Sequence, residues 1–208
     1  MAKLDITKTN AAIDQLLEVT DNPRHRFMLT AYYRHRYLEI AGRYEEIFAP
    51  DMRVKEPVDH FRALGITTTL KGQDQVKGLY SMWAQTHQSI FYADNEQVAV
   101  ADNFIASVAM VYQQTLGRSL IEGGIDVDDP DAYYVYKSVE EMVWPYDDRG
   151  RLVGEDVWEP DPGRAEITKM DPADVTTTEE AGKLLAPFIK PLPSFDEMVL
   201  RKSPAQRL

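Results

Sequence analysis

The chain has 208 residues, of which 44% are hydrophobic, and its 34 acidic and 23 basic residues give a net charge of −11. This length suits one domain with an appendage, and the acidic balance argues against duplex nucleic acid or an anionic membrane surface as partner, because phosphate binding needs clustered Lys and Arg. Cysteine is absent, which excludes disulfides, thiol nucleophiles and Cys-ligated metals and fits a reducing cytoplasm.

The first twenty-two residues predict a separate short helix. Apolar residues recur at helical spacing between Thr9 and Thr20, before Asp21-Asn22-Pro23 ends the pattern. The N-terminus has no apolar signal stretch, and no run approaches the roughly 20 apolar residues of a membrane span. We therefore expect a soluble, cytoplasmic protein without membrane partners.

A long helix is predicted from Pro23 to about Ile40, where Gly42 breaks the pattern. Tyr33, Arg34 and Tyr37 share one of its faces. Phenols and a guanidinium on an inward face predict a lined cavity instead of a solid core. The alternative is that these side chains bury their apolar bodies and keep their polar tips at the surface.

A short helix over Tyr44 to Ala49 precedes a segment with strand-like alternation. Met52, Val54 and Glu56 alternate with charged residues, as in a half-buried strand. Glu56 then either reaches solvent at the strand edge or points into apolar space, where its pKa would rise. His60 follows shortly afterwards, in a stretch without clear periodicity.

Gly72 opens a third helix, which carries Trp83 and ends near His87. From Ser89 onward the period changes, and two strands are predicted up to Leu116, with a bulge or turn at 102–103. Tyr112 lies in the second of these strands.

The acidic loop 122–131 lacks the pattern of a calcium loop, so no metal site is predicted. A strand over Tyr133 to Val143 leads to Trp144, and the turn Asp147-Asp148-Arg149-Gly150 predicts a hairpin with a last strand over 151–159. Asp102 and Glu141 are further candidates if their strands turn them inward.

The composition shifts from Pro160 onward, a stretch that holds seven of the twelve prolines. Short helices are predicted after Thr178 and Ser194. Such a segment has too little apolar surface for a core of its own, so residues 161–208 should pack on the main domain, residues 23–160, or on a partner subunit.

Three segments, RYEEIFAPDMRVKEP, LKGQDQVKGLYSMW and EEMVWPYDDRGRLVGEDVWEPD, resemble the NTF2-like superfamily and in particular its SnoaL-like branch. The resemblance covers Phe27 to about Pro160. It implies an α+β cone, in which N-terminal helices pack on a strongly curved, mainly antiparallel sheet around a pocket, with an irregular or helical C-terminal extension. It also implies a homodimer or a higher homo-oligomer.

The sequence departs from the dehydratases of this superfamily at their catalytic dyad. An ungapped alignment places Tyr37 at the position of their Asp and Phe91 at the position of their His. Glu56 stands where the scytalone-type enzymes have a catalytic Tyr. His87 lies near Phe91 and is a candidate substitute, although a His at a helix C-terminus is commonly a favourable dipole partner.

One branch without this dyad, which the chain resembles in length and aromatic content, is the bacterial diarylpropane lyases of lignin-derived dimers. The resemblance implies a lyase that needs no cofactor, removes a benzylic hydroxyl to form a quinone methide, and then releases formaldehyde to leave a stilbene. The residues implied for this chemistry are Arg34 with Tyr37 to hold the phenolate and Glu56 with His60 for acid and base work.

Ring-binding walls would come from Tyr33, Trp83, His87, Tyr112 and Trp144, whose alternative role is ordinary core packing. Fold alone does not decide function in this superfamily. Two other functions therefore stay open: a dehydratase or isomerase of a polycyclic or steroid-like molecule, and a non-catalytic binding module.

Overall fold

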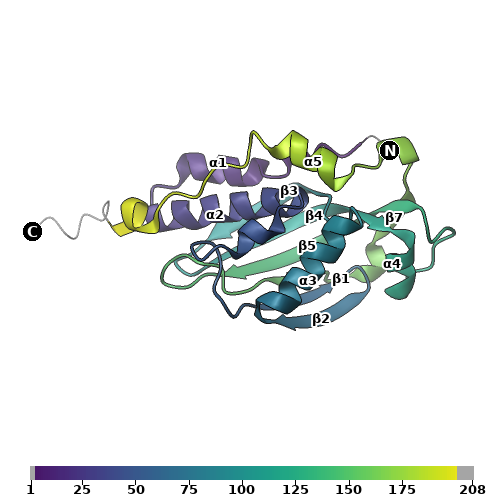
Figure 1. The fold of residues 1–208 in the computed structure, drawn as a ribbon, viewed down its shortest axis with the longest axis horizontal. Coiled ribbons are helices and arrows are strands. Elements are labelled where there is room, and N and C mark those ends of the chain that lie inside the picture. Colours follow the sequence, from purple (N-terminus) through teal and green to yellow (C-terminus); the bar gives the residue numbers. More distant parts are fainter. Residues whose placement is uncertain (1–2, 201–208) are drawn as a thin grey trace, which may run out of the picture.

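A computed structural model describes residues 3–200 as a curved sheet with helices packed on its concave side (Figure 1). The strand order is β2-β1-β6-β5-β4-β3, with β7 paired to β5, and every pairing is antiparallel except β1 with β6. The strands are β1 (Val58–Ala63), β2 (Ile66–Lys71), β3 (Phe91–Val100), β4 (Phe104–Leu116), β5 (Tyr133–Pro145), β6 (Asp156–Trp158) and β7 (Glu166–Lys169). The predicted α+β cone is confirmed.

The helices lie in two layers. Those described are α1 (Ala11–Val19), α2 (Pro23–Ile40), α3 (Gly72–Gln85), α4 (Gly117–Glu122) and α5 (Thr178–Leu185), with short turns η1 (Ile6–Lys8), η2 (Tyr44–Phe48), η3 (Pro162–Arg164), η4 (Pro172–Asp174) and η5 (Asp196–Leu200). Helix α2 lies between the sheet and a covering layer of α1 and α5 (Figure 1). No helix of residues 3–200 is long and apolar enough to cross a membrane.

Helix α2 begins and ends where the sequence predicts. The side chain of Asn22 accepts hydrogen bonds from the backbone N–H groups of Arg24 (2.9 Å) and His25 (3.3 Å), and Pro23 occupies the first turn. Gly42 then takes a left-handed conformation (φ +67°), which ends the helix. The helix is buried on two opposite faces, so its sequence lacks one clean apolar stripe.

The predicted strand at Met52, Val54 and Glu56 is wrong. This segment forms only a single bridge, from Arg53 to Leu152, and the first strand is Val58–Ala63. It pairs with β2 through a turn at Leu64-Gly65, where both residues have positive φ (+55° and +73°). Because Leu is an unusual residue at positive φ, the sequence gives only a weak signal for this hairpin.

The closing hairpin is looser than predicted. Its turn lies at residues 147–150, but only Asp156–Trp158 form a strand, β6. Between them the chain crosses to β1, where the backbone N–H of Val58 donates to Val153 and that of His60 donates to Glu155. This crossing carries Glu155 into the interior beside β1.

A bulge in β3 shapes the sheet and aims one carboxylate inward. The register with β4 shifts between Asp94 and Gln97, and Asn95 has φ +51°. The side chain of Glu96 consequently points under α2 and is 2% exposed.

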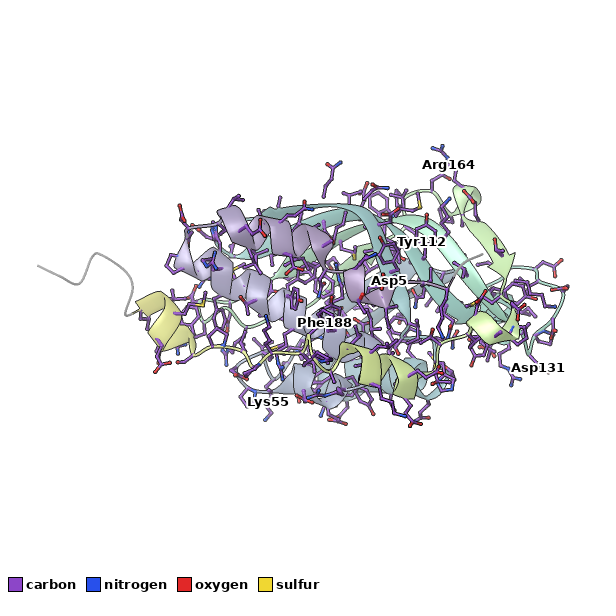
Figure 2. The ribbon with its side chains drawn as sticks, turned by 90° about the horizontal axis from the view of Figure 1, so that it is seen from above. Asp5, Lys55, Tyr112, Asp131, Arg164 and Phe188 are labelled. Carbon is purple, nitrogen blue, oxygen red and sulfur yellow. The ribbon has the colours of Figure 1, made fainter. Side chains whose placement is uncertain are left out.

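The C-terminal segment runs along the outer face of α2, and Phe188 lies over that helix (Figure 2). Helix α5 begins with a capping box, in which the hydroxyl of Thr177 accepts from Glu180 and the Glu180 carboxylate accepts from Thr177. The cap is thus one residue before the predicted Thr178. Buried Ala181 and Leu185 pack with residues of α2.

Candidate active site

A cavity opens between α2, α3 and the concave face of the sheet. It holds about 770 Å³ of space not filled by atoms, solvent at its mouth included. One part of its wall is aromatic and contains Phe61, Trp83, Phe91 and Trp144. Another part is acidic and contains Glu39, Asp59, Glu140 and Glu155. This combination suits a ring-bearing ligand with polar groups at which protons move.

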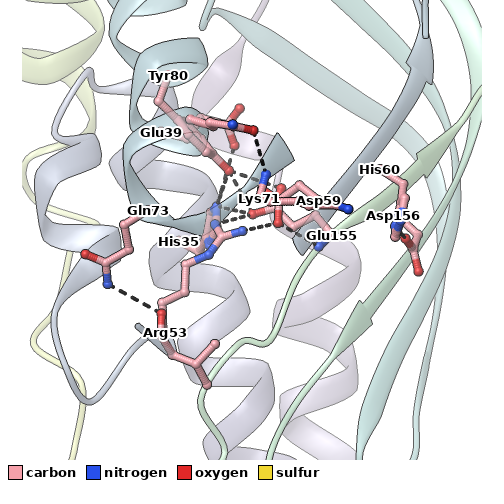
Figure 3. Close-up of polar contacts among 12 residues, drawn as sticks. His35, Glu39, Arg53, Asp59, His60, Lys71, Gln73, Tyr80, Glu155 and Asp156 are labelled. Carbon is pink, nitrogen blue, oxygen red and sulfur yellow. Dashed lines mark hydrogen bonds and ion pairs between the residues drawn. The ribbon is translucent and has the colours of Figure 1, made fainter. Parts of the chain in front are cut away.

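Arg53 forms the base of the acidic wall, and its side chain is fully buried. One guanidinium nitrogen donates to Glu155 Oε1 (2.7 Å) and the other donates to Asp59 Oδ1. The backbone N–H of Glu155 also donates to Asp59 (3.1 Å). One cation therefore holds two carboxyl groups together at the cavity surface (Figure 3).

Tyr80 and His35 extend this network toward α2 and α3. The Tyr80 hydroxyl donates to Glu155 Oε1 (2.8 Å), and His35 Nε2 lies 2.9 Å from that hydroxyl oxygen. Burial, together with the cations of Arg53 and Arg36, lowers the pKa of His35 well below its usual value. A neutral His35 can donate its Nε2 proton to Tyr80, which completes a chain that ends at the carboxylate.

The two carboxyl groups on Arg53 have raised pKa values, and that of Asp59 is raised to about 7. Burial is the main cause that raises the pKa of both Asp59 and Glu155, and the Arg53 cation opposes it. For Asp59 the neighbouring Glu155 carboxyl raises the pKa further. A pair of this kind readily takes up or releases one proton near neutral pH.

Glu140 differs from these groups because it has no partner. It is 6% exposed, and within residues 3–200 its carboxyl forms no hydrogen bond or ion pair. Burial, with a further contribution from the Glu159 carboxyl, raises the pKa of Glu140 to about 8. This unpaired carboxyl lies on the cavity wall, and a pKa of about 8 favours its protonated form at neutral pH.

Glu39 adds a second nearly unpaired acid. Its carboxyl lies 3.9 Å from Nε2 of His35, one helical turn away. Burial and then the Glu155 carboxyl raise the pKa of Glu39 well above its usual value. The wall thus holds more carboxyl groups than neighbouring cations, which favours the protonated form of the unpaired ones.

Three of the nine predicted site residues contribute to the cavity wall: His60, Trp83 and Trp144. The imidazole of His60 nevertheless points away from the interior. Asp59 and Phe61 face inward on β1, so His60 between them faces outward and pairs with Asp156 at 2.6 Å (Figure 3). Both side chains of this pair are 52% exposed.

Glu56 is exposed and stays outside the cavity, because the predicted strand does not form. Tyr33, Arg34 and Tyr37 lie on the opposite side of α2 from the cavity. The Tyr37 hydroxyl donates to the Thr7 backbone carbonyl (2.7 Å) and its ring packs edge-on against Tyr33.

Arg34 points toward the C-terminal segment. Its guanidinium donates to Glu46 (2.8 Å) and to the backbone carbonyl of Lys190 (2.6 Å). The choice of helix face in the sequence prediction was therefore wrong. The face that meets the cavity carries Arg36 and Glu39 instead, and the neighbouring His35 contacts the cavity residue Tyr80.

His87 and Tyr112 also lie outside the cavity. His87, with φ +54°, ends the α3 region, and its Nδ1 accepts from the backbone N–H of Thr178 (3.2 Å). Tyr112 faces the convex side of the sheet, where it packs on Tyr92 and lies near Lys137. Both residues have structural contacts in place of the predicted ligand contacts.

Sequence reasoning missed Glu140, although a signal was present. Along β5 buried and exposed side chains alternate. The even-numbered residues from Ser138 to Trp144 are buried, whereas odd-numbered residues such as Glu141 are exposed. If Trp144 faces the cavity, as predicted, then Glu140 must face it too. Arg53, Tyr80 and Glu155 are joined only by tertiary packing, and no local spacing connects them.

No family model matches the sequence, and no curated protein matches it. Among solved structures, the chain is similar to a proposed SnoaL-like polyketide cyclase from Jannaschia sp. CCS1, with 9% identity, a TM-score of 0.51, and coverage of 68% of this chain and 90% of that chain.

Two further structures are similar over shorter parts of this chain. A phenazine biosynthesis-related protein from Pseudomonas aeruginosa shares 14% identity, with a TM-score of 0.39 and coverage of 62% of this chain and 82% of that one. The CaMKII hub of S. rosetta shares 14% identity, with a TM-score of 0.42 and coverage of 65% and 95%. At such identities structural likeness speaks to fold and not to activity. The chain has the SnoaL-like, NTF2-like cone fold that its sequence predicts.

Proposed function

We propose that this protein is a cofactor-independent lyase that acts on a ring-bearing small molecule by proton transfer. The observation that carries the proposal is Glu140, an unpaired acid with a pKa raised to about 8 on the wall of an aromatic cavity. A group that is protonated at neutral pH and free of protein partners is suited to protonate a leaving hydroxyl.

The substrate class proposed is a diarylpropane-1,3-diol with a free para-hydroxyl on its reacting ring. The aromatic wall, which includes Trp83 and Trp144, offers stacking surfaces to such rings. The acidic wall lies in the same cavity, so that a bound ring places its benzylic carbon within reach of carboxyl groups.

In the first step Asp59 takes the proton of the phenol while Glu140 protonates the benzylic hydroxyl. The C–O bond breaks, water leaves, and the phenol's electron pair moves through the ring to form a neutral quinone methide. Asp59 is now protonated and Glu140 ionised. Arg53, which binds Asp59, keeps that carboxyl beside the cavity in both states.

In the second step Glu140 takes the proton of the terminal alcohol. The bond between the CH2OH carbon and its neighbour breaks, formaldehyde leaves, and the electron pair restores the aromatic ring as Asp59 returns a proton to its oxygen. The products are a stilbene, water and formaldehyde, and both carboxyls regain their starting states. The quinone methide ring of the substrate accepts the electron pair that is released when the carbon–carbon bond breaks.

Formaldehyde release from a diarylpropane diol tests the proposal directly. We expect Glu140→Gln to lower kcat about 10²- to 10⁴-fold, since a proton transfer typically contributes that much. The matched control is Glu141→Gln, which changes the neighbouring exposed carboxylate on the convex face and should retain activity. Folded wild-type protein that yields no formaldehyde and no stilbene would rule out this reaction.

A dehydratase is the second candidate, because the first step alone uses the same Glu140 and Asp59 pair. Product mass separates the two functions. Loss of water without loss of a CH2O unit would favour the dehydratase, whereas loss of both supports the lyase.

A further inference from the structure

A second hollow lies next to the cavity, on the side of α4 and the β1–β2 turn. It holds about 860 Å³ of space not filled by atoms, open solvent included. Its wall contains Leu64, Ile66 and Met82 as apolar surface and Ser119 as a polar group. Trp83 and Gln113 line both this hollow and the cavity, so the two spaces adjoin at these side chains.

In the side-chain amide of Gln113, the nitrogen is hydrogen-bonded and the oxygen has no donor within residues 3–200. Its Nε2 donates to the backbone carbonyl of Gln88 (3.0 Å). Because a carbonyl can only accept, this bond fixes the orientation of the amide. Within residues 3–200 no donor contacts the side-chain oxygen of Gln113, although the residue is only 8% exposed.

Gln113 lines both hollows, so a ligand or water in either of them can supply the missing donor to its side-chain oxygen. Its position between two hollows, beside the indole of Trp83, means that a ligand spanning both spaces would bring its own groups to this oxygen. A phenol supplies both a flat apolar ring for Trp83 and an O–H donor for Gln113.

We propose that the second hollow is the subsite for the distal ring of a two-ring phenolic ligand and that Gln113 selects a free hydroxyl on that ring. This inference rests on the proposed function and deepens it, because it assigns a place and a hydroxyl requirement to the second ring of the proposed substrate. A methyl ether offers no proton and leaves the Gln113 oxygen unpaired. The subsite therefore discriminates phenols from their methyl ethers.

The first test compares binding of 4,4′-dihydroxystilbene with that of its dimethyl ether by quenching of tryptophan fluorescence. In wild-type protein the phenol should bind more tightly. Gln113→Met, which keeps the side-chain length but removes the acceptor, should reduce that preference about tenfold, the value of one hydrogen bond in a buried site. An unchanged preference in this variant would overturn the role of Gln113.

A second variant tests the hollow without altering Gln113. Ser119 lines only the second hollow, so Ser119→Trp should fill it and weaken dihydroxystilbene binding at least tenfold while leaving 4-methylphenol binding unchanged. Ser119→Ala is the matched control and should bind both as wild type does. Equal weakening of both ligands, or of neither, would overturn the subsite.

These binding measurements are independent of turnover. If both variants behave as expected but no formaldehyde forms, the lyase proposal fails and the two-ring phenol subsite stands. If formaldehyde forms while both variants bind as wild type does, the lyase stands and the subsite fails.

Discussion

Two buried arginines lie beside the cavity, and their surroundings differ in charge balance. Arg36 donates to both oxygens of Glu96 (2.7 and 2.8 Å) and to the backbone carbonyl of Thr9 (2.9 Å), so one cation meets one carboxylate. Arg53 meets two carboxyls, Asp59 and Glu155.

Two further acids, Glu39 and Glu140, stand in the wall of the cavity, and no Lys or Arg within residues 3–200 forms an ion pair with either of them. A balanced pair is inert, because each charge stabilises the other across the whole range of ordinary pH. An excess of buried carboxyls must instead be neutralised by protons, which makes them donors and acceptors near neutral pH. The comparison therefore separates a structural ion pair from a site suited to catalysis.

Removal of the Arg53 cation should give the largest change in stability. Arg53→Met leaves two buried carboxyls without their cation and should lower the free energy of unfolding by about 4 kcal/mol at pH 7. Urea denaturation measures this effect. Arg149→Met is the control, since its pair with Asp196 is about half exposed and should contribute less than about 1 kcal/mol. Equal losses in both variants would contradict the account.

The stability of the protein should fall with rising pH because of Glu140. Its folded pKa of about 8 exceeds the usual 4.5, so between these values the folded state keeps a proton that the unfolded chain has released. Stability is then lost as pH rises through this window, by about 3 kcal/mol between pH 5 and pH 8. Glu140→Gln should remove that loss and be more stable than wild type at pH 8, as thermal or urea unfolding at the two pH values will show.

At pH 7, neutralising the carboxyl that pairs with Arg36 and neutralising an unpaired carboxyl of the cavity wall should have opposite effects on the stability of the protein. Glu96→Gln takes the charged partner from Arg36 and should destabilise the protein by about 2 kcal/mol. Glu39→Gln replaces a carboxyl without a Lys or Arg partner, whose ionised form burial disfavours, so stability should stay the same or rise. Destabilisation by both variants alike would mean that Glu39 is an ionised structural partner.

The smallest effect is expected at the Tyr80 hydroxyl. Tyr80→Phe removes the hydrogen bond to Glu155 and should cost about 1 kcal/mol of stability. Tyr92→Phe removes a more exposed hydroxyl, 3.3 Å from Asp94, and should cost less than about 0.5 kcal/mol. Calorimetry of both variants at pH 7 makes the comparison, and a larger loss for Tyr92→Phe would contradict it.

The fold could be predicted because its signals are local. The cap at Asn22, the stop at Gly42 and the alternation of β5 each act within a few residues and agree with the cone. Trp83 and Trp144 are predicted as aromatic walls and do line the cavity, whereas the cavity itself is implied by the family resemblance and not by the side chains of Tyr33, Arg34 and Tyr37, which face away from it.

The acid and base residues could not be predicted in the same way. Helix α2 is covered on its outer face by α1 and α5, so Tyr37 is as buried as His35 and the pattern does not reveal which face meets the cavity. Arg53 and Glu155 meet only because the chain crosses from the closing turn to β1. Long-range packing of this kind leaves no periodic trace in the sequence.

The protonation state of Glu140 tests the central claim most directly. Carbon-13 NMR of labelled glutamate carboxyls, assigned by comparison with Glu140→Gln and followed from pH 4 to pH 10, reports it without any substrate. The Glu140 carboxyl should titrate with a pKa of about 8. A pKa below about 5, the usual range for a solvated glutamate, would contradict it.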